Sequence, residues 1–123
     1  MKRRTLLAAL TGLTLVSGTG PLLAHHGWSW TADGNFQLTG VITDSRLGMP
    51  HGVLTVDADG EVWTVEVGQP WRNERAGLTD AMLAPGKEIT IIGQRSADED
   101  EKRMKAERVV VGETIHNLYP DRD

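Results

Sequence analysis

Two adjacent histidines, His25 and His26, directly follow an apolar run that ends in Ala24. If a signal peptidase cleaves after Ala24, His25 becomes the N-terminal residue. It then carries a free α-amine with a pKa of about 8 beside an imidazole with a pKa of about 6.5. Both nitrogens can reach one metal ion, and such nitrogen-rich donor sets suit Cu(II) and, less selectively, Ni(II) or Zn(II). The alternative is that polar residues follow the cleavage site only to keep it accessible.

A third histidine, His51, begins an expected strand over residues 51–57, and Glu66 lies on the next expected strand over residues 61–67. The Asp-Gly pair between these strands favours a tight hairpin. In either register that this turn allows, His51 and Glu66 share one face of the sheet, because pairing preserves the alternation of side chains. Glu66 would then orient His51 as a metal ligand. The alternative is an exposed ion pair that contributes well under about 1 kcal/mol.

These two features combine into one predicted metal site. The amine and imidazole of His25, with the imidazole of His51, would form the T-shaped set called a histidine brace. Such a set resembles the copper sites of exported copper carriers and of oxidative polysaccharide-cleaving enzymes. His26 would replace or supplement either imidazole. The ten or so residues between His26 and the first strand span about 30 Å when extended, so the arm is long enough to bring His25 and His26 to His51. We expect copper at His25, His26 and His51, with Glu66 and Trp28 as neighbouring residues.

Residues 1–24 have the pattern of an export signal. A positive start at residues 2–4 precedes an apolar run over residues 5–17, and Gly18, Gly20 and Pro21 interrupt any helix after it. The run is too short to cross a bilayer, which takes about 20 residues. We expect a periplasmic mature protein without a membrane anchor, exported by either the general secretory or the twin-arginine route.

The composition of the mature chain limits its size class, its partners and its cysteine chemistry. Removal of 24 of the 123 residues leaves 99, enough for one small domain. The removed segment holds three of the 13 basic residues and none of the 17 acidic ones, so ten basic residues face 17 acidic residues and the net charge is −7. So acidic a protein is a poor partner for nucleic acid or an anionic membrane. The chain has no cysteine, which excludes disulfides and thiolate chemistry.

The expected elements follow the order of the OB-fold, a five-stranded Greek-key barrel. The fold class is all-β with one short helix, and a β-sandwich or another small barrel is the alternative. Residues 25–36 form an extended N-terminal arm, residues 37–119 the barrel and residues 120–123 a charged tail. Strands are expected at 37–46, 51–57, 61–67, 87–95 and 104–111, with one short helix or two helical turns between 71 and 83 and a short closing strand after residue 112. The expected inward side chains are Leu54, Val56, Trp63, Val65, Ile89 and Ile91.

The chain resembles the DUF6152 family, small exported bacterial proteins that contain a domain of unknown function. The stretches that carry the resemblance are "AHHGW", "MPHG", "WTVEVGQPWRNERAGL", "LAPGKEITIIGQR", "MKAERVVV" and "LYPDRD". The family commonly has Asn before the Pro-His pair, where this chain has Met49. The resemblance implies an exported single-domain β-barrel and supplies no reaction.

Two functions of different classes fit these features. The first is a periplasmic metal-binding protein for carriage or storage, with a metal ion and an unidentified periplasmic protein as partners. The alternative is a non-catalytic OB-type module that binds a partner protein or glycan through Trp28, Trp30 and Trp71. An enzyme is not expected, because the chain has no G-x-S-x-G motif, no thiol and no Gly-rich loop that opens a helix.

Signal cleavage after Ala24 is the first testable prediction. Intact-mass spectrometry of the exported protein should give the mass of residues 25–123. A mass that corresponds to any other N-terminal residue would exclude His25 as a source of the terminal amine.

Overall fold

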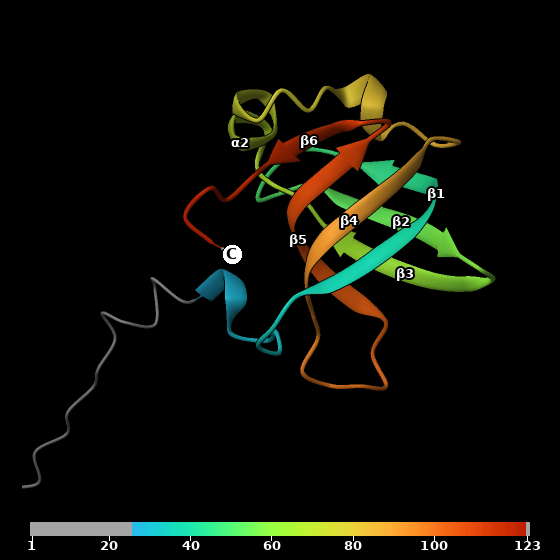
Figure 1. Cartoon of the computed structure of the whole chain (residues 1–123), viewed down its shortest axis with the longest axis vertical. Coiled ribbons are helices and arrows are strands. Elements are labelled where there is room, and N and C mark those ends of the chain that lie inside the picture. Colours follow the sequence, from blue (N-terminus) through green and yellow to red (C-terminus); the bar gives the residue numbers. More distant parts are fainter. Residues whose placement is uncertain (1–25, 123) are drawn as a thin grey trace, which may run out of the picture.

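The computed structural model describes residues 26–122, with His26 described by its backbone alone, and they form a small closed β-barrel (Figure 1). Residues 1–25, and with them the expected signal segment and His25, lie outside the described part. In chain order the elements are η1 (His26–Trp28), β1 (Phe36–Arg46), β2 (Val53–Ala58), β3 (Glu61–Glu66), α2 (Pro70–Arg75), η2 (Asp80–Leu83), β4 (Glu88–Arg95), β5 (Arg103–Val111) and β6 (Thr114–Asn117).

Five strands close the barrel in the OB topology. β1 pairs antiparallel with β2 and with β4, β2 with β3, and β4 with β5. A parallel pairing of β3 with β5 joins the two ends of the sheet. The helical segment connects β3 to β4, which are not neighbours in the sheet, so it is not a crossover between adjacent parallel strands. The predicted OB-like barrel is confirmed.

A tight hairpin sets the register of β2 and β3. Asp59 and Gly60 both have positive φ angles, 52° and 85°, as the turn type favoured by Asp-Gly pairs requires. Ala58 therefore faces Glu61 and Val53 faces Glu66, which is one of the registers that the turn allows. β2 begins at Val53 rather than at residue 51, although backbone hydrogen bonds from Gly52 to the β3 side continue the pairing.

The barrel interior is filled by aliphatic side chains and one indole. All six predicted inward residues are buried, each at most 3 % exposed. Trp63 packs against Phe36 with ring centroids 5.2 Å apart. The further buried apolar residues from the barrel strands include Leu38, Ile42, Met104, Ala106 and Val109.

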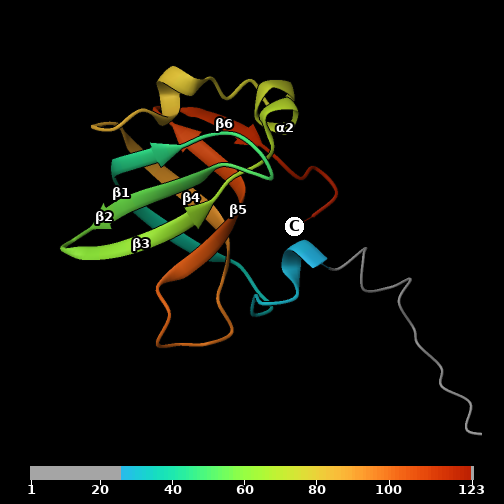
Figure 2. The same ribbon diagram turned by 180° about the vertical axis from the view of Figure 1, so that it is seen from behind.

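The segment between β3 and β4 forms two separate helical turns, α2 and η2, that lie with β6 over one end of the barrel (Figures 1 and 2). The buried Asn73 side chain accepts a hydrogen bond from the Gly68 N–H and donates one to the Gly68 carbonyl, which fixes the entry into α2. Leu78 and Leu83 are 2 % and 0 % exposed, so this segment contributes to the core. The expected closing strand is β6, which pairs with β5.

The N-terminal arm and the C-terminal residues meet on the outer face of β5, as both views show (Figures 1 and 2). Trp28 packs edge-on against Tyr119 with ring centroids 5.0 Å apart. The Arg122 guanidinium lies 3.8 Å from the centre of the Trp28 ring, and its Nε donates to the buried Glu107 carboxylate. The arm is also joined to the end of β4 through the pairing of Thr31 with Ser96. Contacts from both termini therefore cover the outer face of β5.

Replacing Trp63 with Ala should lower the free energy of unfolding by about 3–5 kcal/mol, the usual cost of a large buried aromatic side chain. Urea denaturation followed by circular dichroism measures this change. Trp71, which is 50 % exposed, is the matched control, and Trp71→Ala should move the midpoint far less. Equal shifts for the two variants would contradict the assignment of Trp63 to the core.

Candidate functional site

His51 lies at the mouth of the barrel, in the loop that leads into β2. Its Nε2 is 3.2 Å from Oε1 of Glu66, and its Nδ1 is 3.2 Å from the carbonyl oxygen of Gly52. The side chain is 30 % exposed, so it is reachable from solvent. Both partners of the ring are hydrogen-bond acceptors, so a neutral imidazole, which has one N–H, donates to only one of them. The predicted proximity of His51 and Glu66 is confirmed, although His51 precedes β2 rather than lying on it.

Glu66 is buried, which differs from the exposed ion pair considered as the alternative. It is 4 % exposed, because the N-terminal arm covers the outer face on which the alternation of β3 places it. Its Oε2 accepts a hydrogen bond of 2.9 Å from Nε of Arg103 and a second one from Nη2 of the same guanidinium. One oxygen of the Glu66 carboxylate thus contacts His51, and the other accepts hydrogen bonds from Arg103.

The parallel pairing of β3 with β5 places two cations beside Glu66. Lys105 is its direct partner across the strands, and Arg103 precedes Lys105 by two residues on the same face. The Arg103 guanidinium also lies 3.7 Å from the centre of the Trp30 ring. This cation therefore links the arm to the barrel, through a carboxylate on one side and an indole on the other.

Lys105 is buried against aromatic rings. The residue is 7 % exposed, and its Nζ lies 4.9 Å from the Trp28 ring centre and 5.9 Å from that of Tyr119. Burial lowers the pKa of Lys105; Arg72, Arg122 and Arg103 act in the same direction, and Glu66 acts against them. Burial likewise raises the pKa of Tyr119.

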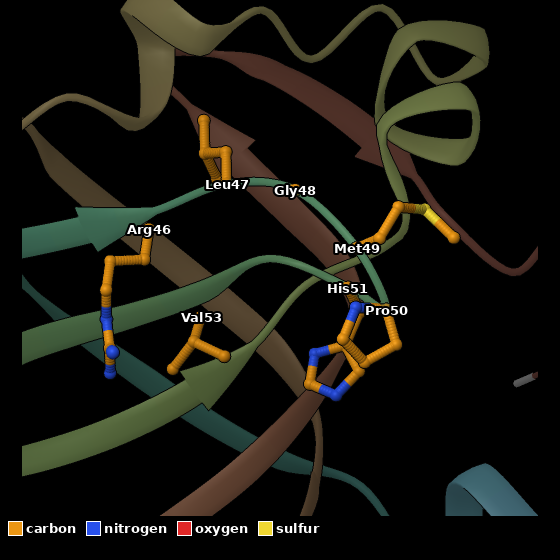
Figure 3. Close-up of a pocket in the computed structure, with 7 residues that line it drawn as sticks. All are labelled: Arg46, Leu47, Gly48, Met49, Pro50, His51 and Val53. Carbon is orange, nitrogen blue, oxygen red and sulfur yellow. The ribbon is translucent and has the colours of Figure 1, made fainter.

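A pocket of about 330 Å³ lies between the arm and the barrel. The arm contributes Gly27, Ser29 and Trp30, and the barrel contributes Pro50, His51, Glu66, Arg103 and Lys105. A second hollow of similar volume lies along residues 46–53 (Figure 3). His51 and Pro50 line both hollows, whereas the Met49 side chain points away from the imidazole (Figure 3). His51 therefore forms part of the wall between the two.

The predicted ligands are only partly within the described part of the chain. His51 and Glu66 lie together; His25 precedes the described residues, and His26 begins η1. Residues 26–122 contain no group of three or more His, Asp or Glu side chains that would hold a metal ion. The Trp28 ring contacts the ammonium group of Lys105, and Trp28 does not line the pocket. The fourth histidine, His116, is buried on β6, where its Nδ1 is 2.9 Å from the Ala76 carbonyl oxygen.

Two pocket residues, Arg103 and Lys105, were not predicted from the sequence. The stretch "RMKAE" alternates charged residues with Met and Ala, which by itself is typical of a strand with one solvated face. The signal that would have found them is the indole-rich arm, because its tryptophans need a surface on which to pack. Arg103 covers Trp30, and Arg122 and Lys105 contact Trp28, whereas Trp71 is 50 % exposed.

The family described as "Family of unknown function (DUF6152)" matches residues 12–105. The chain belongs to the DUF6152 family. No curated protein matches the sequence of this DUF6152 protein. No helix within residues 26–122 is long and apolar enough to cross a membrane.

The comparison with solved structures gives matches to this DUF6152 protein at low sequence identity. The crystal structure of the S. pombe Stn1-ten1 complex matches with a TM-score of 0.50 and 20 % identity, over 63 % of this chain and 57 % of that one. The ZRD-deleted mutant of TiaS in complex with agmatine has a TM-score of 0.47 and 14 % identity, over 63 % and 21 % of the two chains. The DUF6152 protein therefore spans less than two thirds of these chains, and the similarity concerns the fold alone.

Replacing Lys105 with Met should increase the free energy of unfolding near neutral pH, because an apolar side chain of similar length avoids the cost of burying a charge. With a folded-state pKa below the unfolded value of 10.5, protonated Lys105 lowers stability, and this loss disappears as the pH rises towards 10.5. The difference in the free energy of unfolding between Lys105→Met and wild type should shrink as the pH rises towards 10.5. Urea denaturation at a series of pH values measures it.

Lys102, whose side chain is 44 % exposed, provides the control, and Lys102→Met should not reproduce the pH-dependent gain. A Lys105→Met variant that is less stable than wild type at every pH would overturn the prediction.

Proposed function

We propose that this protein is an exported, non-catalytic metal-binding protein that carries or stores Cu(II) in the periplasm. The ligands would be the amine and imidazole of a mature N-terminal His25 and the imidazole of His51, with His26 as an additional donor. One observation carries the proposal: Gly27 and Ser29 of the arm line the same pocket as His51. In the sequence His25 and His26 directly precede Gly27, so both expected donors are within two residues of the pocket wall along the chain.

The surroundings of His51 support a role as a ligand. In the tautomer with the proton on Nε2, Glu66 accepts that proton, and Nδ1 would bind a metal in place of its contact with the Gly52 carbonyl oxygen. Glu66 is in turn fixed by Arg103, so the imidazole is oriented by a buried carboxylate that has little freedom to move. Copper(II) prefers nitrogen donors in a tetragonal arrangement, and an amine with two or three imidazoles meets that preference.

The donors among the described residues are one imidazole and one carboxylate, and the carboxylate is already engaged by Arg103. The remaining donors must come from His25 and His26. The proposal therefore depends on the processed N-terminus. The alternative function, a module that binds a partner protein or glycan, would use the exposed Trp71 and needs no metal.

The exported protein should bind one Cu(II) per chain, with tetragonal nitrogen coordination in electron paramagnetic resonance. A variant with one Met added before His25 should bind much more weakly, because the α-amine then leaves the chelate. His51→Ala should also weaken binding. Affinity should fall as the pH drops to about 6 and below, because the imidazoles and the amine must be deprotonated to ligate.

His116→Gln is the control, because it removes one imidazole yet keeps an amide that can donate to the Ala76 carbonyl. It should leave copper affinity unchanged. Equal affinity of the mature and Met-extended proteins would exclude the histidine brace, and absence of stoichiometric copper binding would favour the partner-binding module.

A further inference from the structure

Lys105 is a buried lysine on the wall of the pocket between the arm and the barrel. It is 7 % exposed and forms no ion pair with a carboxylate of residues 26–122. Its Nζ lies over the faces of Trp28 and Tyr119, and the charge of Glu66 acts on it from across the strand pair. Buried ammonium groups normally have a carboxylate or carbonyl oxygen within hydrogen-bond distance. An acceptor supplied by a ligand would complete the site.

The carboxylates nearby are already committed to other cations. Glu66, the strand partner of Lys105, accepts from Arg103 and contacts His51. Glu107, on the same face of β5, is fully buried and pairs with Arg122 and Arg108. Arg72 also lowers the pKa of Lys105 through its positive charge. Its own Nη1 donates a hydrogen bond to the carbonyl oxygen of Leu118.

These groups leave an excess of positive charge at the pocket, although the whole chain carries a net charge of −4. A concave site with positive walls concentrates small anions, and a charge-assisted hydrogen bond there is stronger than a neutral one. The local charge therefore favours a ligand of negative charge.

We propose that this pocket binds one small oxyanion, a carboxylate or a tetrahedral oxyanion, with the Lys105 ammonium as its charged donor and Arg103 as the second positive wall. A volume of about 330 Å³ admits such an ion with a few water molecules and excludes large ligands. This site does not require the proposed copper ligands. An anion bound beside Lys105 would also offset the repulsion between Lys105 and a metal at His51.

The arm forms part of the anion site through Gly27. A Cβ atom at this position would lie 2.8 Å from Nζ of Lys105, so the end of the lysine side chain would have to shift to accommodate it. The ammonium group therefore lies directly against the backbone of the arm. A site formed by both the arm and the barrel is closed on two sides, which is what selective binding of a small ion requires.

The test is a titration of metal-free exported protein with sodium phosphate, sodium sulfate and sodium acetate, each compared with sodium chloride at equal ionic strength. Isothermal calorimetry should show saturable one-to-one binding in wild-type protein for at least one of the three oxyanions. Phosphate and sulfate without acetate would identify a tetrahedral ligand, and acetate alone a carboxylate. Lys105→Met should weaken binding by at least about tenfold, the effect of losing one charge-assisted hydrogen bond.

Lys102→Met is the matched control, because this lysine is on the surface and pairs with Glu61. It should bind the anion as wild type does, and Lys105→Arg should retain binding better than Lys105→Met. Circular dichroism verifies the fold, and Lys105→Gln replaces Lys105→Met if the latter does not fold. Unchanged anion affinity on removal of the Lys105 charge, or no saturable binding beyond that of chloride, would overturn the proposal. Because the protein is metal-free, a failure to bind copper leaves this result unaffected.

Discussion

The parallel pairing of β3 with β5 is the constraint on which the rest of this structure depends. It closes the barrel, and it also fixes which side chains meet on the outside. Because Val65 faces Met104 across this pair, the interior is apolar, and because Glu66 faces Lys105, the exterior at the same point is charged. The register that completes the core therefore also assembles the pocket residues from β3 and β5.

The charged outer face of β5 is covered rather than solvated. Arg103, Lys105 and Glu107 alternate along the strand, and the arm, α2 and the C-terminal residues lie over them. Burial of charge is costly unless each group is paired, and two of these three groups are paired with side chains of opposite sign. The third, Lys105, lacks such a bond. The fold thus retains an unfavourable charge at the place where the arm meets the barrel, which is a feature more often associated with binding than with stability.

The element order and the alternation of side chains predicted the barrel and its local features, whereas the register between distant strands was not predicted. Alternation and the Asp-Gly turn predicted the hairpin, the inward positions of Leu54 and Trp63, and the shared face of His51 and Glu66. The partner of β5 depends on a pairing between strands about 40 residues apart, for which alternation carries no information. For that reason the burial of Glu66 was not predicted, and Lys105 was not singled out. The histidine pair lies at the edge of what the structure describes, so the metal site remains a hypothesis from the sequence.

The contacts between the two termini have a consequence for the order in which this molecule is completed. Trp28 precedes all the strands and is synthesised before them, yet it packs against Tyr119 and Arg122, which are among the last residues of the chain. These contacts of Trp28 can form only after the end of the chain has been made, whereas the contacts of Trp30 with Arg103 and of Thr31 with Ser96 need only the strands. Attachment of the arm is therefore completed only when the C-terminal residues are in place.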